Sequence, residues 1–283
     1  MNVGIVGLGL MGGSLGRALV RQGEHKVYAL DVNPESMLKG EMMCAFDVEL
    51  TEENAKELDI FIVATRPEYF KEICDKFIPK LKNGAVVTDF CGIKRDVVSL
   101  MNEYKNEYPE LNFVGGHPMA GREFSGIEHS KVNLFDKASM ILVPVHTDIF
   151  VMDEIKSFYL SLGFSEVAIT DAENHDSMIA FTSQLCHIVS NAFIKNKTAD
   201  KHFGYSAGSY KDLTRVARLD PDMWAGLMTK NSDKLLPELT ELIGSLTEYK
   251  LALENNDQES LRQLLSDGNQ RKLKIDIKNT KKV

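Results

Sequence analysis

The sequence predicts an α/β protein in which an N-terminal doubly wound parallel sheet is followed by an all-helical C-terminal half. Short apolar runs alternate with amphipathic stretches from residue 3 to residue 170, and strand-like runs stop beyond that point. Strands that alternate with helical patterns pair in parallel through right-handed crossovers. Near-continuous apolar strands indicate that helices cover both faces of the sheet. We therefore expect two domains, at residues 1–170 and 171–283.

Seven apolar runs are the expected strands. They occupy residues 3–7, 26–31, 59–65, 85–90, 112–116, 139–144 and 165–170. Between the last two runs, Thr147 and Asp148 are typical helix N-cap residues, so we expect a helix from there to about Gly163. Strands and helices thus alternate until the helical half begins.

One run in the helical half carries apolar residues at alternating spacings of four and three. Its members are Leu235, Leu239, Leu242, Leu246, Tyr249 and Leu253. This spacing is typical of a coiled-coil seam. Because a helical half of this length has only a small core, we interpret the seam as shared with a second subunit and predict a homodimer. Packing within one chain is the alternative.

The composition argues against several classes of partner. A formal net charge of -8 and a pI near 5.5 disfavour binding to nucleic acid or to an anionic membrane surface. No segment approaches the roughly 18 unbroken apolar residues of a membrane span. We expect a soluble protein with a small-molecule partner.

The cysteines indicate a reducing compartment. Cys44, Cys74, Cys91 and Cys186 lie far apart, with no CxxC pattern and no Cys/His pair. This spacing signals neither a zinc site nor a disulfide framework. We therefore expect no metal and a cytoplasmic location.

A glycine-rich stretch, GLGLMGGSLG, joins the first expected strand to a helix. Gly7, Gly9 and Gly12 form the pattern GxGxxG, with Leu10 and Met11 inside it. The first glycine allows a tight turn, the second lets a pyrophosphate approach the backbone, and the third lets helix and strand pack closely. The helix N-terminus supplies amide donors for phosphate charge. We expect these five residues to bind a dinucleotide on a Rossmann-type domain.

An acidic residue at the end of the second strand indicates which dinucleotide binds. Asp31 follows Gly12 by nineteen residues, where a carboxylate accepts hydrogen bonds from the adenosine ribose. A carboxylate there would repel a 2′-phosphate, and the stretch LDVNPES offers no arginine to receive one. We therefore predict NAD rather than NADP. Thr65, after the third main run, is placed with the cofactor-binding residues.

A histidine follows the fifth main run, in the stretch VGGHPMAG. His117 can exchange a proton near neutral pH, and Pro118 prevents a regular continuation of the chain. Ligands bind at the carboxyl edge of open α/β sheets, so His117 is a candidate catalytic group; a residue that merely caps a strand is the alternative. The stretch TDFCGIKRD brings Cys91 and Lys94 to the same edge.

Cations and histidines in the helical half extend the candidate site. Lys211, Arg215 and Arg218 lie at helical spacing, which suits a carboxylate substrate, although a solvated face is the alternative. His175 and His187 are twelve residues apart on one expected helix, roughly 18 Å, so they cannot hold the same atom. His187 lies among apolar neighbours and fits a core position as well as a site.

Together these stretches resemble the prephenate/arogenate dehydrogenase family of tyrosine biosynthesis. The resemblance extends from GLGLMGGSLG through Asp31, TDFCGIK and GGHPMAGREFSGIEHSKVNLFDKASMILVP to ENHDSMIAFTSQLCH, KDLTRVA and DPDMW. It implies that His117 hydrogen-bonds the ring hydroxyl of the substrate and that Arg215 binds a substrate carboxylate. It also implies that His187 lines the site, with His175 in a second histidine role, and that the chain dimerises through its helical half.

The implied reaction is the NAD-dependent oxidative decarboxylation of prephenate to 4-hydroxyphenylpyruvate. Lys94 is included among the substrate-binding residues, on the strength of the TDFCGIK match. Two positions depart from the family pattern, because Gly92 stands where the family commonly has serine and Gln184 where it often has histidine. A hydroxyl partner for the substrate is therefore missing at residue 92.

Three alternatives remain open at this point. The amino analogue arogenate differs from prephenate only at the side-chain keto group, and the sequence does not distinguish them. A β-hydroxyacid dehydrogenase would need a catalytic lysine in the helical half, for which Lys211 is the one candidate. A non-catalytic NAD-sensing dimer would not need His117 together with Arg215.

Overall fold

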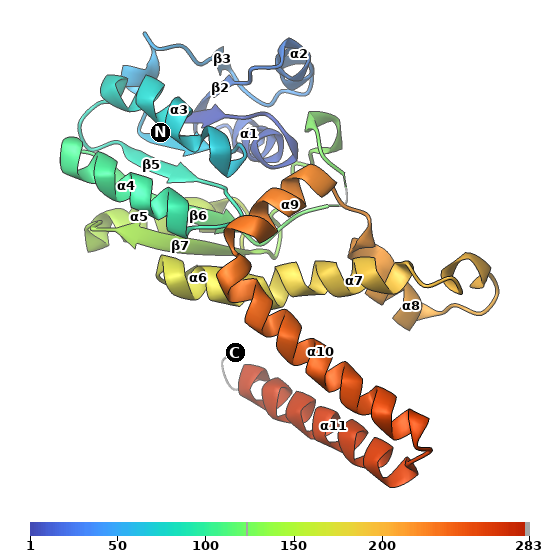
Figure 1. Cartoon of the computed structure of the whole chain (residues 1–283). Coiled ribbons are helices and arrows are strands. Elements are labelled where there is room, and N and C mark those ends of the chain that lie inside the picture. The colour runs from blue at the N-terminus through green and yellow to red at the C-terminus, as the bar shows by residue number, and fades with distance from the viewer. Residues whose placement is uncertain (123, 281–283) are drawn as a thin grey trace. The chain divides into compact units, whose positions relative to one another are not determined.

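The computed structural model describes residues 1–122 and 124–280 (Figure 1). The chain forms two compact units, one of them Met1–Asn231 and the other beginning at Ser232. The first unit holds the whole sheet together with the helices that cover it. The compact units divide the chain after Asn231, and residues 171–231 pack with the sheet in this single chain. The expected domain boundary at residue 170 therefore stays a prediction.

Eight strands form a single sheet in the order β3-β2-β1-β4-β5-β6-β7-β8. The strands are β1 (Asn2–Val6), β2 (Lys26–Leu30), β3 (Val48–Glu49), β4 (Ile60–Val63), β5 (Val86–Asp89), β6 (Asn112–Pro118), β7 (Ser139–Val145) and β8 (Glu166–Ile169). All seven predicted strands are present, and the short β3 is an addition. The strand order turns back between β1 and β4, which is where such sheets bind a dinucleotide.

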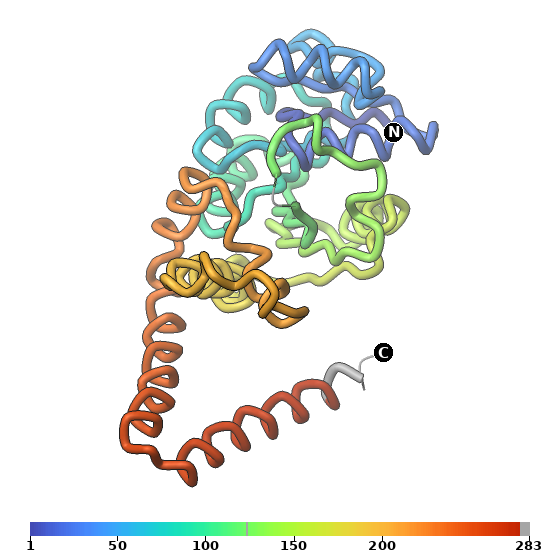
Figure 2. The backbone as a smooth tube through the Cα atoms, turned by 90° about the vertical axis from the view of Figure 1, so that its right-hand side faces the viewer, coloured from blue at the N-terminus to red at the C-terminus, as the bar shows by residue number. Residues whose placement is uncertain are grey.

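The expectation of parallel pairing is wrong for one pair. β6 and β7 are antiparallel, with His117 opposite Ile141, whereas the neighbouring pairs β5–β6 and β7–β8 are parallel. The connection between β6 and β7 holds no crossover helix among its described residues beyond the short η4 (Ile127–His129). Figure 2 shows this green segment passing beside α1 (Leu10–Gln22), where Arg17 donates to the carbonyl oxygen of Ser130 at 2.6 Å.

Helices cover both faces of the sheet. α1 and α5 (Ile149–Ser161) pack on one face, and α3 (Phe70–Phe77) and α4 (Arg95–Glu107) pack on the other. The remaining helices are α2 (Pro34–Met42), α6 (Ala172–Ile179), α7 (Cys186–Ile194), α8 (Gly208–Thr214), α9 (Pro221–Lys230), α10 (Ser232–Glu254) and α11 (Gln258–Thr280). The predicted helix start is confirmed, because the Asp148 side chain accepts from the amide of Phe150 and caps α5.

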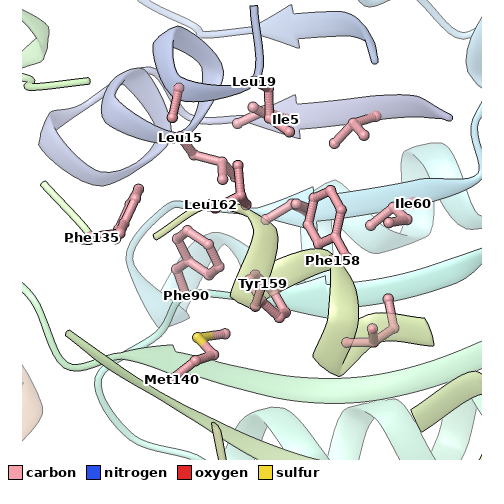
Figure 3. Close-up of a cluster of buried hydrophobic side chains, with 14 of the residues drawn as sticks. Ile5, Leu15, Leu19, Ile60, Phe90, Phe135, Met140, Phe158, Tyr159 and Leu162 are labelled. Carbon is pink, nitrogen blue, oxygen red and sulfur yellow. The ribbon is translucent and has the colours of Figure 1, made fainter. Parts of the chain in front are cut away.

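Alternate residues of each strand enter two separate cores. On β4, Ile60 and Ile62 pack with α1 and α5, while Phe61 and Val63 pack with α3 and α4. Figure 3 shows the first of these cores, in which Tyr159 of α5 lies near the middle. Because both sheet faces are covered, the central strands β1, β4, β5 and β6 consist mainly of buried apolar residues, as the sequence predicted.

The helix that follows β8 contains an irregular turn. Between α6 and α7, residues Ala180–Leu185 form a π-helical turn, a feature that often occurs at functional sites. An 18-residue window of the helix Ala172–Ile194 has a mean hydropathy of 1.2, enough for a membrane span by length and composition alone. The helix also carries the buried polar residues His175, Asp176 and Gln184, which are hydrogen-bonded to other parts of the first unit. We therefore interpret it as a helix packed within the folded protein.

The second unit consists of α10 and α11. All the residues of the predicted leucine seam lie on α10, which confirms the helical interpretation of that run. In the single chain Leu246 is 58% exposed and Leu253 62% exposed, whereas Leu235 is buried. Large apolar side chains at this level of exposure along one helix are what a protein-protein contact would cover.

Candidate active site

The glycine loop between β1 and α1 is shaped for a phosphate. Gly7 has φ +100°, and a Cβ there would lie 2.7 Å from the carbonyl oxygen of Ala64. A Cβ at Gly12 would lie 1.9 Å from the Gly7 carbonyl oxygen, so helix and loop pack as closely as a glycine permits. Gly9 is the N-cap of α1 without a capping side chain, and a Cβ at Gly9 would meet nothing within 4 Å. The helix N-terminus therefore opens onto free space, which fits a pyrophosphate.

Two further predicted cofactor residues lie against this loop. The Asp31 carboxylate accepts from the amide of Leu8 at 2.7 Å, which fixes it beside the glycines, and from the amide of Asn33 at 2.8 Å. The Thr65 methyl group lies 2.8 Å from the position of a Cβ at Gly7. The structure thus brings together the predicted cofactor-binding residues of β1, α1, β2 and β4. A carboxylate in this position fits ribose hydroxyls and repels a 2′-phosphate.

His117 lies near the end of β6, where two glycines bring the strand close to β5. A Cβ at Gly116 would lie 2.5 Å from the carbonyl oxygen of Asp89, so only glycine permits this approach. The Gly116 amide donates to the Asp89 carboxylate at 3.0 Å. The glycines of the VGGHPMAG stretch therefore fix β6 against the end of β5, and they place His117 at the sheet edge.

Two histidines and an aspartate form a chain of hydrogen bonds. His117 Nδ1 lies 2.9 Å from Nε2 of His175, and Nδ1 of His175 lies 2.7 Å from Oδ1 of Asp176. His117 is partly exposed, whereas His175 and Asp176 are each 1% exposed. His175 was expected to bind substrate. The geometry instead places it behind His117 in the interior.

Lys94 is also interior. Its side chain is 0% exposed, and Nζ donates to the Asp89 carboxylate at 2.5 Å and to the carbonyl oxygen of Cys91 at 2.7 Å. Lys94 was expected to contact substrate, but in this structure its ammonium group is engaged by the loop after β5. The residue therefore holds the loop that carries Cys91 and Gly92 beside β6.

Sequence reasoning missed the groups that surround Asp176. The amides of Lys94 and Arg95 donate to its two carboxylate oxygens at 2.7 and 3.0 Å, and Arg95 Nε donates at 3.1 Å. Asn231 donates to the backbone carbonyl of Asp176 at 2.9 Å and to the side-chain oxygen of Gln184 at 2.9 Å. Gln184, which departs from the family pattern, thus belongs to this network.

Burial and nearby charge set the protonation of the network. Burial, with the charge of Lys94, holds the pKa of His117 well below its usual value. Burial likewise lowers the pKa of His175. Burial alone would raise the pKa of Asp176. Hydrogen bonds from His175 and from the amides of Arg95 and Lys94 lower the pKa by more than burial raises it, so the net shift is downward. At neutral pH the two histidines are neutral and the aspartate is ionised.

His187 lines a separate cavity of about 460 Å³. Its Nδ1 donates to the carbonyl oxygen of Ser183 in the π-helical turn at 2.9 Å, and its ring stacks on Trp224 at 3.8 Å between centroids. Lys195 and Asn191 also line the cavity. His187 is half-buried, and burial lowers its pKa. The structure therefore separates His187 from His175, as the sequence spacing predicted.

Of the predicted cations of the helical half, Arg215 lies close enough to His187 to affect its pKa. Arg215 begins the short helix η7 (Arg215–Ala217), and its charge lowers the pKa of His187. Lys211 is exposed on α8. Arg66, which follows β4, pairs with Asp220 at 3.2 Å, and Asp220 caps α9. Sequence reasoning missed Trp224, although its position in the DPDMW stretch after Arg215 is a usable signal.

Comparison with known proteins identifies a family along most of the chain. The family model described as prephenate dehydrogenase, nucleotide-binding domain, matches residues 15–166. The model described as prephenate dehydrogenase, dimerization domain, matches residues 171–267.

Individual relatives agree with the family models. A cyclohexadienyl dehydrogenase of Zymomonas mobilis is 27% identical over 97% of this chain and 96% of its own length. A prephenate dehydrogenase of Aquifex aeolicus, solved in complex with hydroxyphenyl propionate and NAD+, superposes with a TM-score of 0.82 at 30% identity, over 97% of this chain and 98% of that one. An arogenate dehydrogenase of Synechocystis superposes with a TM-score of 0.79 at 25% identity, over 97% and 100%.

Proposed function

This chain belongs to the prephenate dehydrogenase family, and we propose that it oxidises and decarboxylates prephenate to 4-hydroxyphenylpyruvate, with NAD as the cofactor, in tyrosine biosynthesis. Family membership makes the protein an oxidoreductase with a nucleotide-binding domain. The observation that carries the proposal is the neutral His117, held by His175 at the same sheet edge as the glycine loop.

The residues present fit NAD. Gly7, Gly9 and Gly12 with the first amides of α1 would hold the pyrophosphate, while Asp31 would accept from the adenosine ribose. The complex of the Aquifex relative with NAD+ supports the same cofactor for this chain. When bound, NAD supplies a hydride acceptor. β4 and β5 separate β1 from β6, so three strand spacings of about 4.8 Å put His117 roughly 14 Å along the sheet from the glycine loop.

His117 would act as the general base. The substrate loses a hydride from its carbinol carbon while His117 accepts the proton of the hydroxyl, so the carbon–oxygen bond gains carbonyl character. The bond from the ring to its carboxylate then breaks, CO2 leaves, and the electron pair completes the aromatic ring. The proton returns from His117 to the oxygen, which becomes the phenol. Partial burial of the ring and the charge of Lys94 lower the pKa of His117, so it is neutral and ready to accept this proton.

Arg215 and His187 would hold the rest of the substrate. Arg215 would bind a carboxylate, since a guanidinium can engage both oxygens. The cavity lined by the stacked rings of His187 and Trp224 offers an aromatic wall with polar groups, which suits the side-chain end of the substrate. The exposed leucines of α10 support a homodimer, and the four free cysteines are compatible with a cytoplasmic location.

The test is the initial rate of NADH or NADPH formation by the purified protein. Prephenate and arogenate are supplied separately, each with NAD and with NADP. Turnover of prephenate with NAD supports the proposal, and faster turnover of arogenate assigns the amino substrate instead. The control is the variant His117→Asn, which should lose turnover while its NAD binding, measured by calorimetry, stays unchanged. NAD binding without turnover of either substrate would contradict the proposed reaction.

A further inference from the structure

We propose that Asp176, acting through His175, fixes the tautomer of His117 and thereby makes Nε2 of His117 the atom that accepts the substrate proton. Asp176 and His175 are then positioning residues rather than substrate ligands. The inference rests on the proposed function for its catalytic meaning, but the tautomer itself is a property of the protein alone.

The first step is that Asp176 can only accept hydrogen bonds. Oδ1 receives the amide of Lys94, and Oδ2 receives the amide and the Nε of Arg95. Three donors aimed at one carboxylate leave no place for a proton on it, because a protonated oxygen would face an N–H group. Asp176 is therefore a fixed, ionised acceptor.

The second step fixes the tautomer of His175. Its Nδ1 lies 2.7 Å from Oδ1 of Asp176, so Nδ1 must carry the hydrogen that the carboxylate accepts. A bare nitrogen there would set two lone pairs against each other. Because the ring is buried and neutral, it has one ring proton, and its Nε2 is bare.

The third step fixes which ring nitrogen of His117 carries its hydrogen. The bare Nε2 of His175 lies 2.9 Å from Nδ1 of His117, so Nδ1 of His117 donates to it. A neutral imidazole has only one ring proton, which leaves Nε2 of His117 as a free acceptor. This is the nitrogen required of a general base, and the bond to His175 also fixes the plane of the His117 ring.

The same chain accommodates the charge that forms in the reaction. When Nε2 of His117 takes the substrate proton, Nδ1–H stays bonded to the neutral acceptor of His175. The ionised Asp176 then lies one imidazole away from the new positive charge. Among the described residues, two cations lie near this network: Lys94 is paired with the buried Asp89, and Arg95 is paired with Asp176 itself.

The decisive variant is Asp176→Asn. Its single oxygen would stay with the two Arg95 donors. Its NH2 group would face Nδ1 of His175, and the amide of Lys94 would lose its acceptor. His175 would then accept at Nδ1 and donate from Nε2, and the hydrogen of His117 would move to Nε2. We expect 15N NMR of histidine-labelled protein to show Nε2 of His117 bare in the wild type and protonated in the variant. The signals are assigned by their loss in His117→Asn.

Kinetics with two variants of His175 provide the matched pair. His175→Gln keeps an acceptor oxygen for His117 and a donor for Asp176, whereas His175→Met fills similar volume without either. General-base catalysis contributes roughly 10²- to 10⁴-fold, so we expect kcat to fall within that range in Asp176→Asn and His175→Met, with little change in KM. His175→Gln should recover much of this loss.

Each result bears on one claim. A protonated Nε2 on His117 in the wild type overturns the inference, and so does an unchanged tautomer in folded Asp176→Asn protein. Equal kcat values in the Gln and Met variants would assign His175 a packing role only and overturn it as well. If the wild type turns over neither prephenate nor arogenate, the proposed function fails, while the NMR result still decides the tautomer.

Discussion

The glycine loop allows a substitution that weakens cofactor binding without disturbing the fold. At Gly9 a Cβ meets nothing within 4 Å, and φ -75° with ψ -157° is open to alanine. Gly9→Ala gains about 0.4–1 kcal/mol from the lower entropy of the unfolded chain. It loses about 0.5–1 kcal/mol because alanine is a poorer N-cap. We therefore expect the free energy of unfolding to change by less than about 0.5 kcal/mol.

The effect on NAD should be much larger. The new methyl group occupies the space into which the first amides of α1 point, so the pyrophosphate loses its closest approach to the backbone. A hydrogen bond to a charged group contributes about 1.5–3 kcal/mol, and every 1.4 kcal/mol is tenfold in affinity. Losing one such bond raises the Kd for NAD roughly 10- to 150-fold. Calorimetric titration with NAD and urea unfolding measure the two quantities on the same protein.

Two further glycines serve as controls. Gly268→Ala on α11 also adds a Cβ in open space and should leave the Kd for NAD unchanged. Gly12→Ala should instead destabilise the fold by about 1–3 kcal/mol or more, because its Cβ would lie 1.9 Å from a backbone oxygen. An unchanged Kd in Gly9→Ala, or a loss of stability as large as that of Gly12→Ala, would refute the assignment of the loop.

Three other predictions follow from the site and from α10. Lys94→Met leaves Asp89 buried without its cation and should lower the free energy of unfolding by about 3–5 kcal/mol, measured with urea. Because His117 must be neutral and its pKa lies below 6.5, kcat/KM should stay level around pH 7 and fall only as pH drops through that lowered pKa; a fall beginning above pH 7 would contradict this assignment. Leu246→Asp should convert the proposed homodimer to a monomer in sedimentation, and a monomeric wild type would refute the proposed seam.

Much of the fold could be predicted because its signals are local. The glycine loop, the acid at Asp31 and the apolar strands each specify their structure within a few residues. Strand direction is different, because periodicity shows that 139–144 is a strand but not which way it runs. The antiparallel β7 depends on a connection of residues 119–138 that has no crossover helix among its described residues.

The site could be predicted only in part, because its support comes from tertiary contacts. His117 lies at the end of an apolar run, directly after two glycines and before a proline, and this local pattern identifies it in the sequence. The bond of His175 to Asp176 joins neighbours on one helix, although helical neighbours do not ordinarily face each other. Asp176 is held there by Lys94 and Arg95, which lie more than eighty residues away in sequence. No spacing rule reveals such a pairing.

The π-helical turn Ala180–Leu185 makes residue count critical in the middle of a core helix. A π turn holds more residues than an α-helical turn, and each added or removed residue rotates the helix beyond it by about 100°. A one-residue deletion that made this turn α-helical would rotate α7, and His187 would no longer face Trp224. The π-helical turn thus sets the rotation of α7 about the helix axis relative to α6. One end of the helix directs His175 at His117 and the other directs His187 at its cavity, so neither orientation survives a change in length between them.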